Sequence, residues 1–110
     1  MDESKFNQLA EETMAEIEEA IESSDFDIDY DNVADILTLE FPNRSRVIIN
    51  KQTPLSQIWV AAKSGGYHFD FDAKTSTWCL NTNSEKELFR ELSSYCSEQL
   101  GEPVELNSKS

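Results

Sequence analysis

Long apolar runs are missing from this sequence, and so are the targeting signals that direct many proteins out of the cytoplasm. No stretch of about 18 apolar residues occurs, so no segment is expected to cross a membrane. The acidic, polar start MDESKFNQ resembles neither a secretory signal peptide nor an Arg-rich organelle presequence. We therefore expect a cytoplasmic protein, most simply a bacterial one.

Cysteine and histidine, which supply many metal ligands and nucleophiles, are scarce. Cys79 and Cys96 form no CxxC motif, and His68 is the only histidine, so no zinc site is expected and the thiols should be reduced. A Cys79–His68 nucleophilic pair would need an activating pocket and a third group, and the sequence indicates neither. Phosphate loops and serine elbows are also missing, so we do not expect an enzyme.

Positive charge is nearly absent from the first 35 residues, although the rest of the chain is balanced. These residues hold 13 acids and one base, Lys5, which gives −12 of the total net charge of −13. Residues 36–110 hold nine acids and eight bases. A surface this negative attracts cations or a basic protein, and it repels nucleic acid and anionic membranes. A merely solvated acidic face is the alternative, and the concentration of charge argues against it.

Two helices and about six strands are predicted, which is enough for one domain in 110 residues. The first helix is expected at 4–22, where apolar residues recur at helical spacing. The second is expected to begin at Ser84, which would form a capping box with Glu87, and to stop at Gly101. Alternating apolar residues predict strands at 26–31, 36–41, 45–50, 57–62, 67–71 and 77–80.

Short turns between successive strands, one of them at Gly65-Gly66, imply antiparallel pairing. Two amphipathic helices can then cover the same face of the sheet. This predicts an α+β two-layer sandwich, with two terminal helices packed on one face of a roughly six-stranded antiparallel sheet. The other face should be solvated. The domain is expected to span 1–104, followed by a loosely ordered tail at 105–110.

The acids gather at the end of the first helix and along the next strand, where they oppose local stability. Glutamates at a helix C-terminus oppose the helix dipole, and Glu18 and Glu22 form a like-charge pair one turn apart. Each such effect costs about a few tenths of a kcal/mol. We call this group the acidic ridge, and its members are Glu18, Glu19, Glu22, Asp25, Asp27, Asp29 and Asp31. Three further acids, Glu11, Glu12 and Glu16, lie nearby in the helix.

Carboxylates are the ligands that calcium, magnesium, manganese and iron prefer. The string DFDIDYD is nevertheless no EF-hand loop. The glycine of that loop would have to stand at Tyr30, counting from Asp25, or at Asn32, counting from Asp27. Carboxylates spaced along a strand cannot enclose one ion, so we expect weak, labile binding of several cations.

The segment QIWVAA places a tryptophan opposite two aliphatic residues. If Ile58 and Val60 face the helices, Trp59 lies on the open sheet face with Gln57 and near Asn50, as a typical binding anchor. With the opposite register, Trp59 belongs to the core. The alternation alone leaves both arrangements open.

The stretch NKQTPLSQIWVAAKSGGYHFD, residues 50–70, closely resembles the signature of the frataxin family. Pro54, Gln57, Trp59, the Gly65-Gly66 pair and Tyr67-His68 all stand in register. The acidic helix and strand, the sheet and the final helix extend the resemblance to the bacterial branch over nearly the whole chain. It implies an α-β sandwich that binds ferrous and ferric iron weakly. The same carboxylates can also bind other divalent cations.

The resemblance also implies the partners and the residues that bind them. The partners would be the cysteine desulfurase and the scaffold protein of iron–sulfur cluster assembly, with this chain as an iron-dependent regulator and a monomer. An iron donor, or an iron-oxidising storage protein that oligomerises with iron, is the alternative, although no Glu-x-x-His pair is present. The implied metal ligands are Glu11, Glu18, Glu19, Glu22, Asp25, Asp27, Asp29 and Asp31. The implied partner-binding residues are Glu18, Glu19, Glu22, Asp27, Asn50, Gln57 and Trp59.

The sequence departs from the family pattern in two places. Ser23 and Ser24 interrupt the acidic run where relatives often carry a carboxylate and an aromatic residue, and Asn7 stands where some relatives place a potential ligand. The departures put the tighter metal sites of the family in doubt for this chain and leave the acidic ridge intact.

Overall fold

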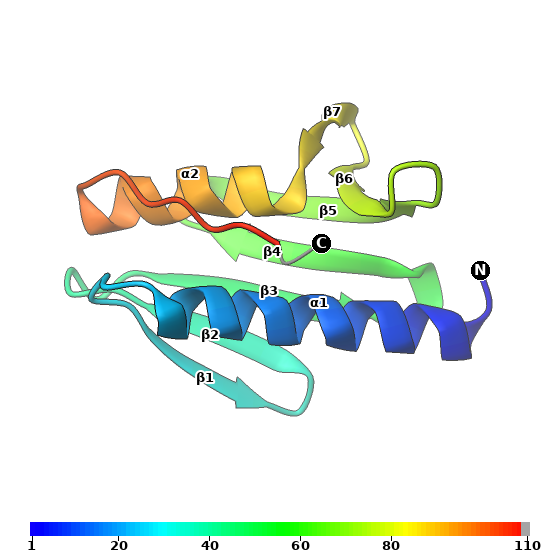
Figure 1. Cartoon of the computed structure of the whole chain (residues 1–110), viewed down its shortest axis with the longest axis horizontal. Coiled ribbons are helices and arrows are strands. Elements are labelled where there is room, and N and C mark those ends of the chain that lie inside the picture. The colour runs from blue at the N-terminus through cyan, green and yellow to red at the C-terminus, as the bar shows by residue number, and fades with distance from the viewer. Residues whose placement is uncertain (109–110) are drawn as a thin grey trace.

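A computed structural model describes residues 1–108 as two helices packed on one face of a seven-stranded antiparallel sheet (Figure 1). The predicted α+β two-layer sandwich is thus confirmed. Sheet order follows chain order from β1 to β7, so every strand pairs with its neighbours in sequence. The elements are α1 (Glu3–Ser23), β1 (Asp29–Val33), β2 (Ile36–Glu40), β3 (Arg46–Gln52), a 3-10 turn (Thr53–Leu55), β4 (Gln57–Ala62), β5 (Gly65–Asp72), β6 (Thr77–Leu80), β7 (Asn83–Glu87) and α2 (Leu88–Leu100).

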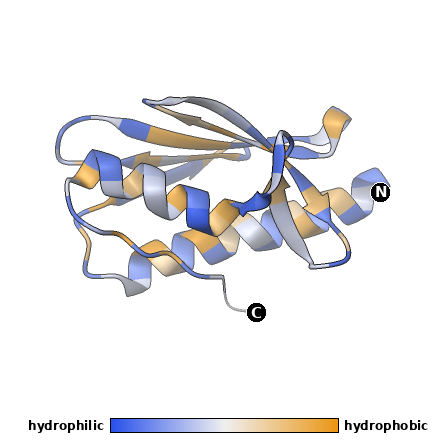
Figure 2. Ribbon diagram, turned by 90° about the horizontal axis from the view of Figure 1, so that it is seen from above, coloured by the Kyte–Doolittle hydropathy of each residue, from blue (hydrophilic) through white to orange (hydrophobic). Residues whose placement is uncertain are grey.

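The core lies between the helices and the sheet, and Figure 2 shows these two layers from above. Helix α1 begins at Asp2, whose side chain accepts a hydrogen bond from the backbone N–H of Lys5, and it buries the predicted stripe. The indole of Trp78 on β6 donates to the hydroxyl of Thr13 on α1 over 2.9 Å, and its ring packs edge-on against Phe6. Burial of a side chain such as Phe6 contributes about 1.5–3 kcal/mol.

The seventh strand corrects the expected sheet of six strands and the expected start of the second helix. Ser84 lies in β7, which pairs with β6 through an irregular register, and α2 begins only at Leu88. Glu87, predicted as the third residue of the helix, is its N-cap and accepts from the N–H of Phe89 over 2.8 Å. Both residue types suit a helix start, so the pairing with β6 decided the boundary. The stop at Gly101 is as predicted, with φ of 79°.

Two other boundaries differ from the predictions. Strand β1 begins at Asp29 because β2 ends at its partner, Glu40, so residues 25–28 have no neighbouring strand to pair with. Ile28 is still buried as the alternation required. Gly65 and Gly66 are the first residues of β5 rather than a turn, and the turn lies just before them.

The tail predicted to be loose from residue 105 is partly docked on the core. Val104 and Leu106 are buried, and each exchanges two hydrogen bonds with a serine hydroxyl on α2, Ser97 and Ser93 respectively. The prediction is therefore wrong at residue 106, and residues 109–110 lie outside the described part. Between residues 1 and 108, neither helix has the length and apolarity that a membrane crossing requires.

Candidate functional site

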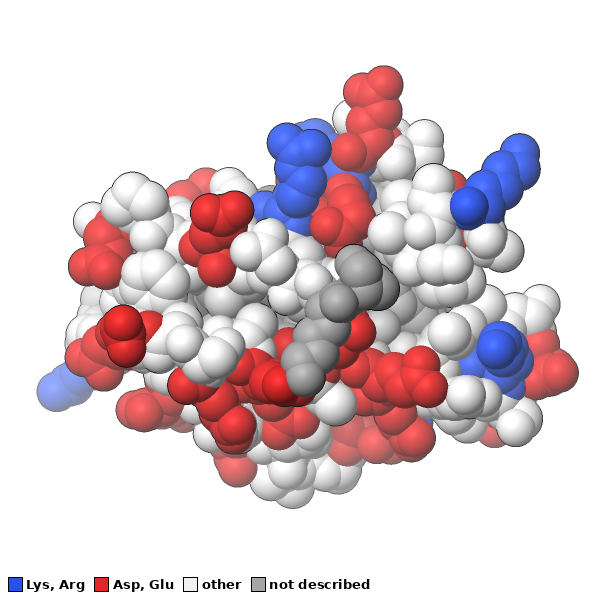
Figure 3. All heavy atoms as spheres, in the orientation of Figure 1, with Lys and Arg blue, Asp and Glu red and all other residues white. Residues whose placement is uncertain are grey.

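The acidic ridge lies where the last turns of α1 run beside β1, and Figure 3 shows acidic side chains in a band along α1. Every ridge member is exposed except Glu18, which is half-buried. Asn32 on β1 donates to Glu18 over 3.3 Å, and the hydroxyl of Tyr30 donates to Glu22. These bonds come from neutral groups, so they hold the helix and the strand together without cancelling ridge charge.

The ridge continues around the edge of the sheet. Asp25 and Asp27 stand in the connection between α1 and β1. Asp29 pairs with Glu40 and Asp31 with Thr38, which places both aspartates on the open face of the sheet, since Tyr30 pairs with the buried Leu39. The carboxylates of the acidic ridge therefore follow a curved strip rather than a cup.

Tyr30 shows how strongly the ridge acts on a neighbour. The hydrogen bond to Glu22 raises the pKa of Tyr30 to about 12, and desolvation and the charges of Glu22 and Glu18 add to the effect. Tyr30 is therefore a hydrogen-bond donor to the ridge at neutral pH, and it engages one carboxylate oxygen of Glu22.

A complete metal cage does not form from the side chains that the structure describes. Among residues 1–108, no group of three or more His, Cys, Asp or Glu side chains is arranged to hold a metal ion. Each ridge carboxylate can offer one or two oxygen atoms to a hydrated cation.

Glu11 has a different environment from the acidic ridge. The ammonium of Lys51 lies 3.4 Å from Glu11 and 3.6 Å from Asp35, and this lysine side chain is only 8% exposed. Lys51 thus balances part of the charge that the sequence assigned to one continuous surface. The contact joins residues 40 positions apart, so spacing along the chain gave no sign of it.

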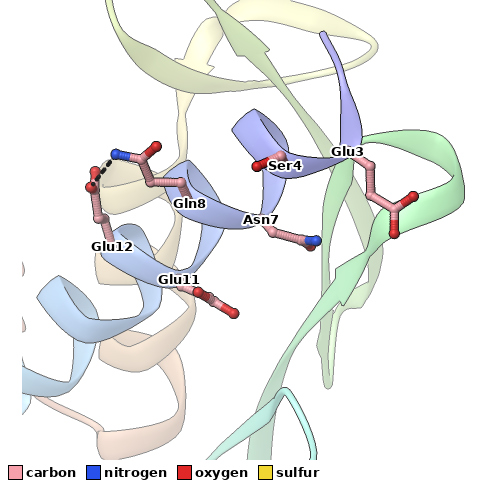
Figure 4. Close-up of a pocket in the computed structure, with 6 residues that line it drawn as sticks. All are labelled: Glu3, Ser4, Asn7, Gln8, Glu11 and Glu12. Atoms are coloured by element: carbon pink, nitrogen blue, oxygen red, sulfur yellow. Dashed lines mark hydrogen bonds between the residues drawn. The ribbon is translucent and has the colours of Figure 1, made fainter.

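Glu11 also lines an open hollow on the first turns of α1, and Figure 4 shows the lining side chains. The amide of Gln8 donates to Glu12 over 3.2 Å, while Asn7 accepts from the hydroxyl of Thr53 over 3.2 Å. The amide of Asn7 is thus engaged with the 3-10 turn. Both contacts hold polar groups in place, and neither adds to a cation site.

Trp59 stands on the open sheet face, because Ile58 and Val60 are buried under the helices. Its ring is half-buried and stacks on His68, with ring centroids 4.2 Å apart and planes 9° from parallel. The indole N–H donates to Gln57 over 2.9 Å, and the amide of Gln57 donates to Asp70 over 3.0 Å. Asn50 is the register partner of Trp59 on β3. The partner-binding candidates of β3 and β4 thus meet on one face, and His68 and Asp70 join them.

The two thiols are free and buried. Cys79 pairs in register with Asp70 rather than with His68, and its sulfur lies 3.5 Å from the hydroxyl of Thr77. Cys96 is fully buried, and desolvation raises its thiol pKa to about 12. Cys79 and His68 thus share a face of the sheet, as the sequence allowed, but they stand one register position apart.

Known proteins match this chain over nearly its whole length. A family model described as a frataxin-like domain matches residues 1–102. The iron-sulfur cluster assembly protein CyaY of Paraburkholderia xenovorans is 45% identical over 104 residues, which are 94% of this chain and 96% of the relative. The protein of the same name from Pseudomonas aeruginosa is 41% identical over 105 residues, 96% of each chain.

Solved structures give the same result. The frataxin from Psychromonas ingrahamii, described within the CyaY protein family, aligns with a TM-score of 0.89 and 38% identity, covering 98% of this chain and all of its own. Yeast frataxin aligns with a TM-score of 0.63 and 24% identity over 87% of this chain and 80% of its own. The yeast protein supports the shared fold only.

Proposed function

This chain belongs to the frataxin family, and from that premise we propose that it regulates iron–sulfur cluster assembly by docking on the cysteine desulfurase and binding iron weakly. The names of its bacterial relatives support a role in assembly. The observation that carries the docking proposal is the acidic ridge, an exposed strip of carboxylates on a sheet edge. We place this activity in the cytoplasm.

The ridge is suited to a basic surface on the desulfurase. Complementary charges mainly raise the association rate and fix the orientation of a complex. Glu18 and Glu22 are held by neutral donors on β1, so the strip keeps both its shape and its charge. Iron would occupy the same carboxylates, reduce their charge and so modulate the docking.

Trp59 would supply the apolar part of the interface, toward the desulfurase-bound scaffold protein. A tryptophan held on an open face by stacking and hydrogen bonds loses little freedom on binding. The stack on His68 and the bond to Gln57 hold Trp59 in this way before any partner arrives.

A binding titration against the purified desulfurase at low and at high salt tests the proposal. We expect tight binding at low salt that weakens steeply as salt rises. Glu22→Lys should weaken it at least tenfold, while Glu85→Lys, an equal charge change on exposed β7, serves as the matched control. Absence of binding at low salt, or equal losses in both variants, would refute ridge docking.

Oxygen uptake with ferrous iron separates the regulator from an iron-oxidising protein. The regulator proposed here consumes oxygen no faster than free iron does, because no three-ligand cluster is assembled among residues 1–108. Fast catalytic turnover would favour the oxidising function instead.

A further inference from the structure

A small basic surface lies on the open sheet face of this acidic protein. Three of its nine basic residues, Arg44, Arg46 and Lys63, line an open hollow of about 480 Å³. Its floor is apolar, formed by Ile48 and Ala61, and no acidic residue lines it. We call this site the basic hollow.

The strand register explains why a hollow forms here. The turns after β2 and after β4 lie at the same end of the meander (Figure 1). Ile48 pairs with Ala61, which in turn pairs with Gly66, so the side chains become shorter from β3 to β5 across the face. A Cβ atom added at Gly66 would meet nothing within 4 Å. The bases on the two turns therefore stand above a low floor.

The turn that carries Arg44 is held in a fixed shape. Arg44 has a left-handed φ of 69°, and its N–H donates to the carbonyl of Phe41 over 2.9 Å. Asn43 accepts from the N–H of Ser45 over 3.0 Å, and the N–H of Phe41 donates to the carbonyl of Ser45 over 3.1 Å. These bonds fix the backbone of the turn, and the Arg44 side chain that it carries is exposed.

The bases of the hollow are not consumed by internal ion pairs. Arg46 lies 3.5 Å from Glu40, in a pair exposed to solvent on both sides. Arg44 and Lys63 make no ion pair within residues 1–108, whereas Lys51 contacts two carboxylates. In a chain of net charge −13, two cations are thus left facing outward over an apolar floor.

We propose that the basic hollow docks an acidic segment of a partner protein on the open sheet face. An arginine fork binds a carboxylate with two parallel hydrogen bonds, and the apolar floor suits the methylene groups of a glutamate. Trp59 lies two residues before Ala61 on the same face of β4, so one partner surface can reach both. This inference rests on the proposed function and deepens it. The partner at the sheet face would present acidic residues, whereas the desulfurase would present a basic patch to the ridge.

A second copy of this chain fits the hollow poorly. Each copy carries −13, and Asp29, Asp31 and Glu40 on the same sheet face would repel an incoming acidic ridge. At physiological salt, charges closer than about 8 Å still interact strongly. The hollow is confined to one end of the sheet, whereas the acidic ridge extends along a helix end and an edge strand. The favoured occupant is therefore a short acidic segment on an otherwise less acidic partner.

Amide NMR with a short tetraglutamate peptide in physiological salt tests this site directly, with the tetraglutamine peptide as control. We expect shifts at Arg44, Ala61, Lys63 and the Trp59 indole from the glutamate peptide only. In Arg44→Glu/Lys63→Glu the affinity should fall at least tenfold. The control Lys74→Glu/Lys86→Glu carries the same charge change on exposed residues elsewhere and should bind like the parent.

Several outcomes would overturn the proposal. These are no shifts with the glutamate peptide, equal shifts with both peptides, or equal losses in the two variants. Inorganic phosphate that binds the hollow more tightly than the peptide would point to a small anion instead. Self-association in sedimentation that Arg44→Glu/Lys63→Glu abolishes would make a second copy the occupant.

A second titration keeps this proposal separate from the proposed function. Arg44→Glu/Lys63→Glu should bind the isolated desulfurase at least as tightly as the parent does. It should bind the scaffold-loaded desulfurase at least tenfold more weakly than the parent does. Loss of binding to the isolated enzyme would contradict a separate sheet-face site. If the parent fails to bind the desulfurase while the peptide still occupies the hollow, the proposed function fails and the hollow stands.

Discussion

The acidic ridge and the open sheet face are both exposed, but they are organised in different ways. In the ridge, like charges are brought together along a helix end and an edge strand, and no cage forms among residues 1–108. On the sheet face, Trp59 is fixed by a ring stack and by a chain of hydrogen bonds through Gln57 to Asp70. The first arrangement favours long-range attraction, and the second favours a defined contact.

The largest effect is expected where the organised contact is removed. Trp59→Ala should weaken binding to the scaffold-loaded desulfurase by about 2 kcal/mol, or roughly 30-fold, because a central tryptophan anchor is lost. Isothermal titration calorimetry measures this, and Trp59→Phe should retain most of the affinity. Equal affinity of Trp59→Ala and the parent would mean that the sheet face is not an interface.

Neutralising the ridge should reveal the cost of its charge. Glu18→Gln/Glu19→Gln/Glu22→Gln should be more stable by roughly 1 kcal/mol, because like-charge and helix-dipole repulsion is relieved. Thermal unfolding should show a rise of about 4–8 °C. Salt or calcium should raise the melting temperature of the parent more than that of the variant. If neither salt nor calcium changed the melting temperature of the parent, close packing of the ridge charges would be contradicted.

The hydrogen-bond chain beneath Trp59 offers a finer test of the organised surface. Gln57→Ala removes the acceptor of the indole N–H and should weaken scaffold-dependent binding by about 0.5–1.5 kcal/mol. Affinity for the isolated desulfurase, which depends on the ridge, should not change. A loss of equal size with both titrants would show that the two surfaces do not act separately.

The smallest effect concerns the pH dependence of the ridge. The folded pKa of Tyr30, about 12, is raised above the ordinary 10.0, so its hydrogen bond to Glu22 contributes fully below pH 10. The contribution is lost as the pH rises through 12. The melting temperature of the parent should therefore fall toward or below that of Tyr30→Phe across this range. Parallel curves for the two proteins would show that the bond is not formed in solution.

Features with a regular spacing along the chain could be predicted from the sequence. Features that depend on contacts between distant residues could not. Alternation placed Trp59 on the face opposite Ile58 and Val60, and the structure then showed that the helices cover Ile58 and Val60. Local rules could not decide between a helix start and a seventh strand at Ser84, because pairing with β6 is a long-range choice. The same holds for Lys51, whose contact with Glu11 joins a strand to a helix far away in sequence.

The same distinction applies to the two candidate binding surfaces, the acidic ridge and the basic hollow. Composition identified the acidic ridge, because 13 acids in 35 residues can be counted without a fold. The basic hollow needed the register that places Ile48, Ala61 and Gly66 side by side and brings Arg44 and Lys63 to one end of the sheet. Basic residues that are scattered through a segment with nearly equal numbers of acids and bases form no recognisable pattern in the sequence.

Stopped-flow kinetics with the scaffold-loaded desulfurase tests the central contrast most directly. At low salt, Glu18→Gln/Glu19→Gln/Glu22→Gln should slow association at least tenfold and leave dissociation nearly unchanged, since long-range attraction acts before contact. Trp59→Ala should speed dissociation about 30-fold and leave association nearly unchanged. If both variants altered the same rate constant, or if the ridge variant associated as fast as the parent, the proposed division between the two surfaces would be contradicted.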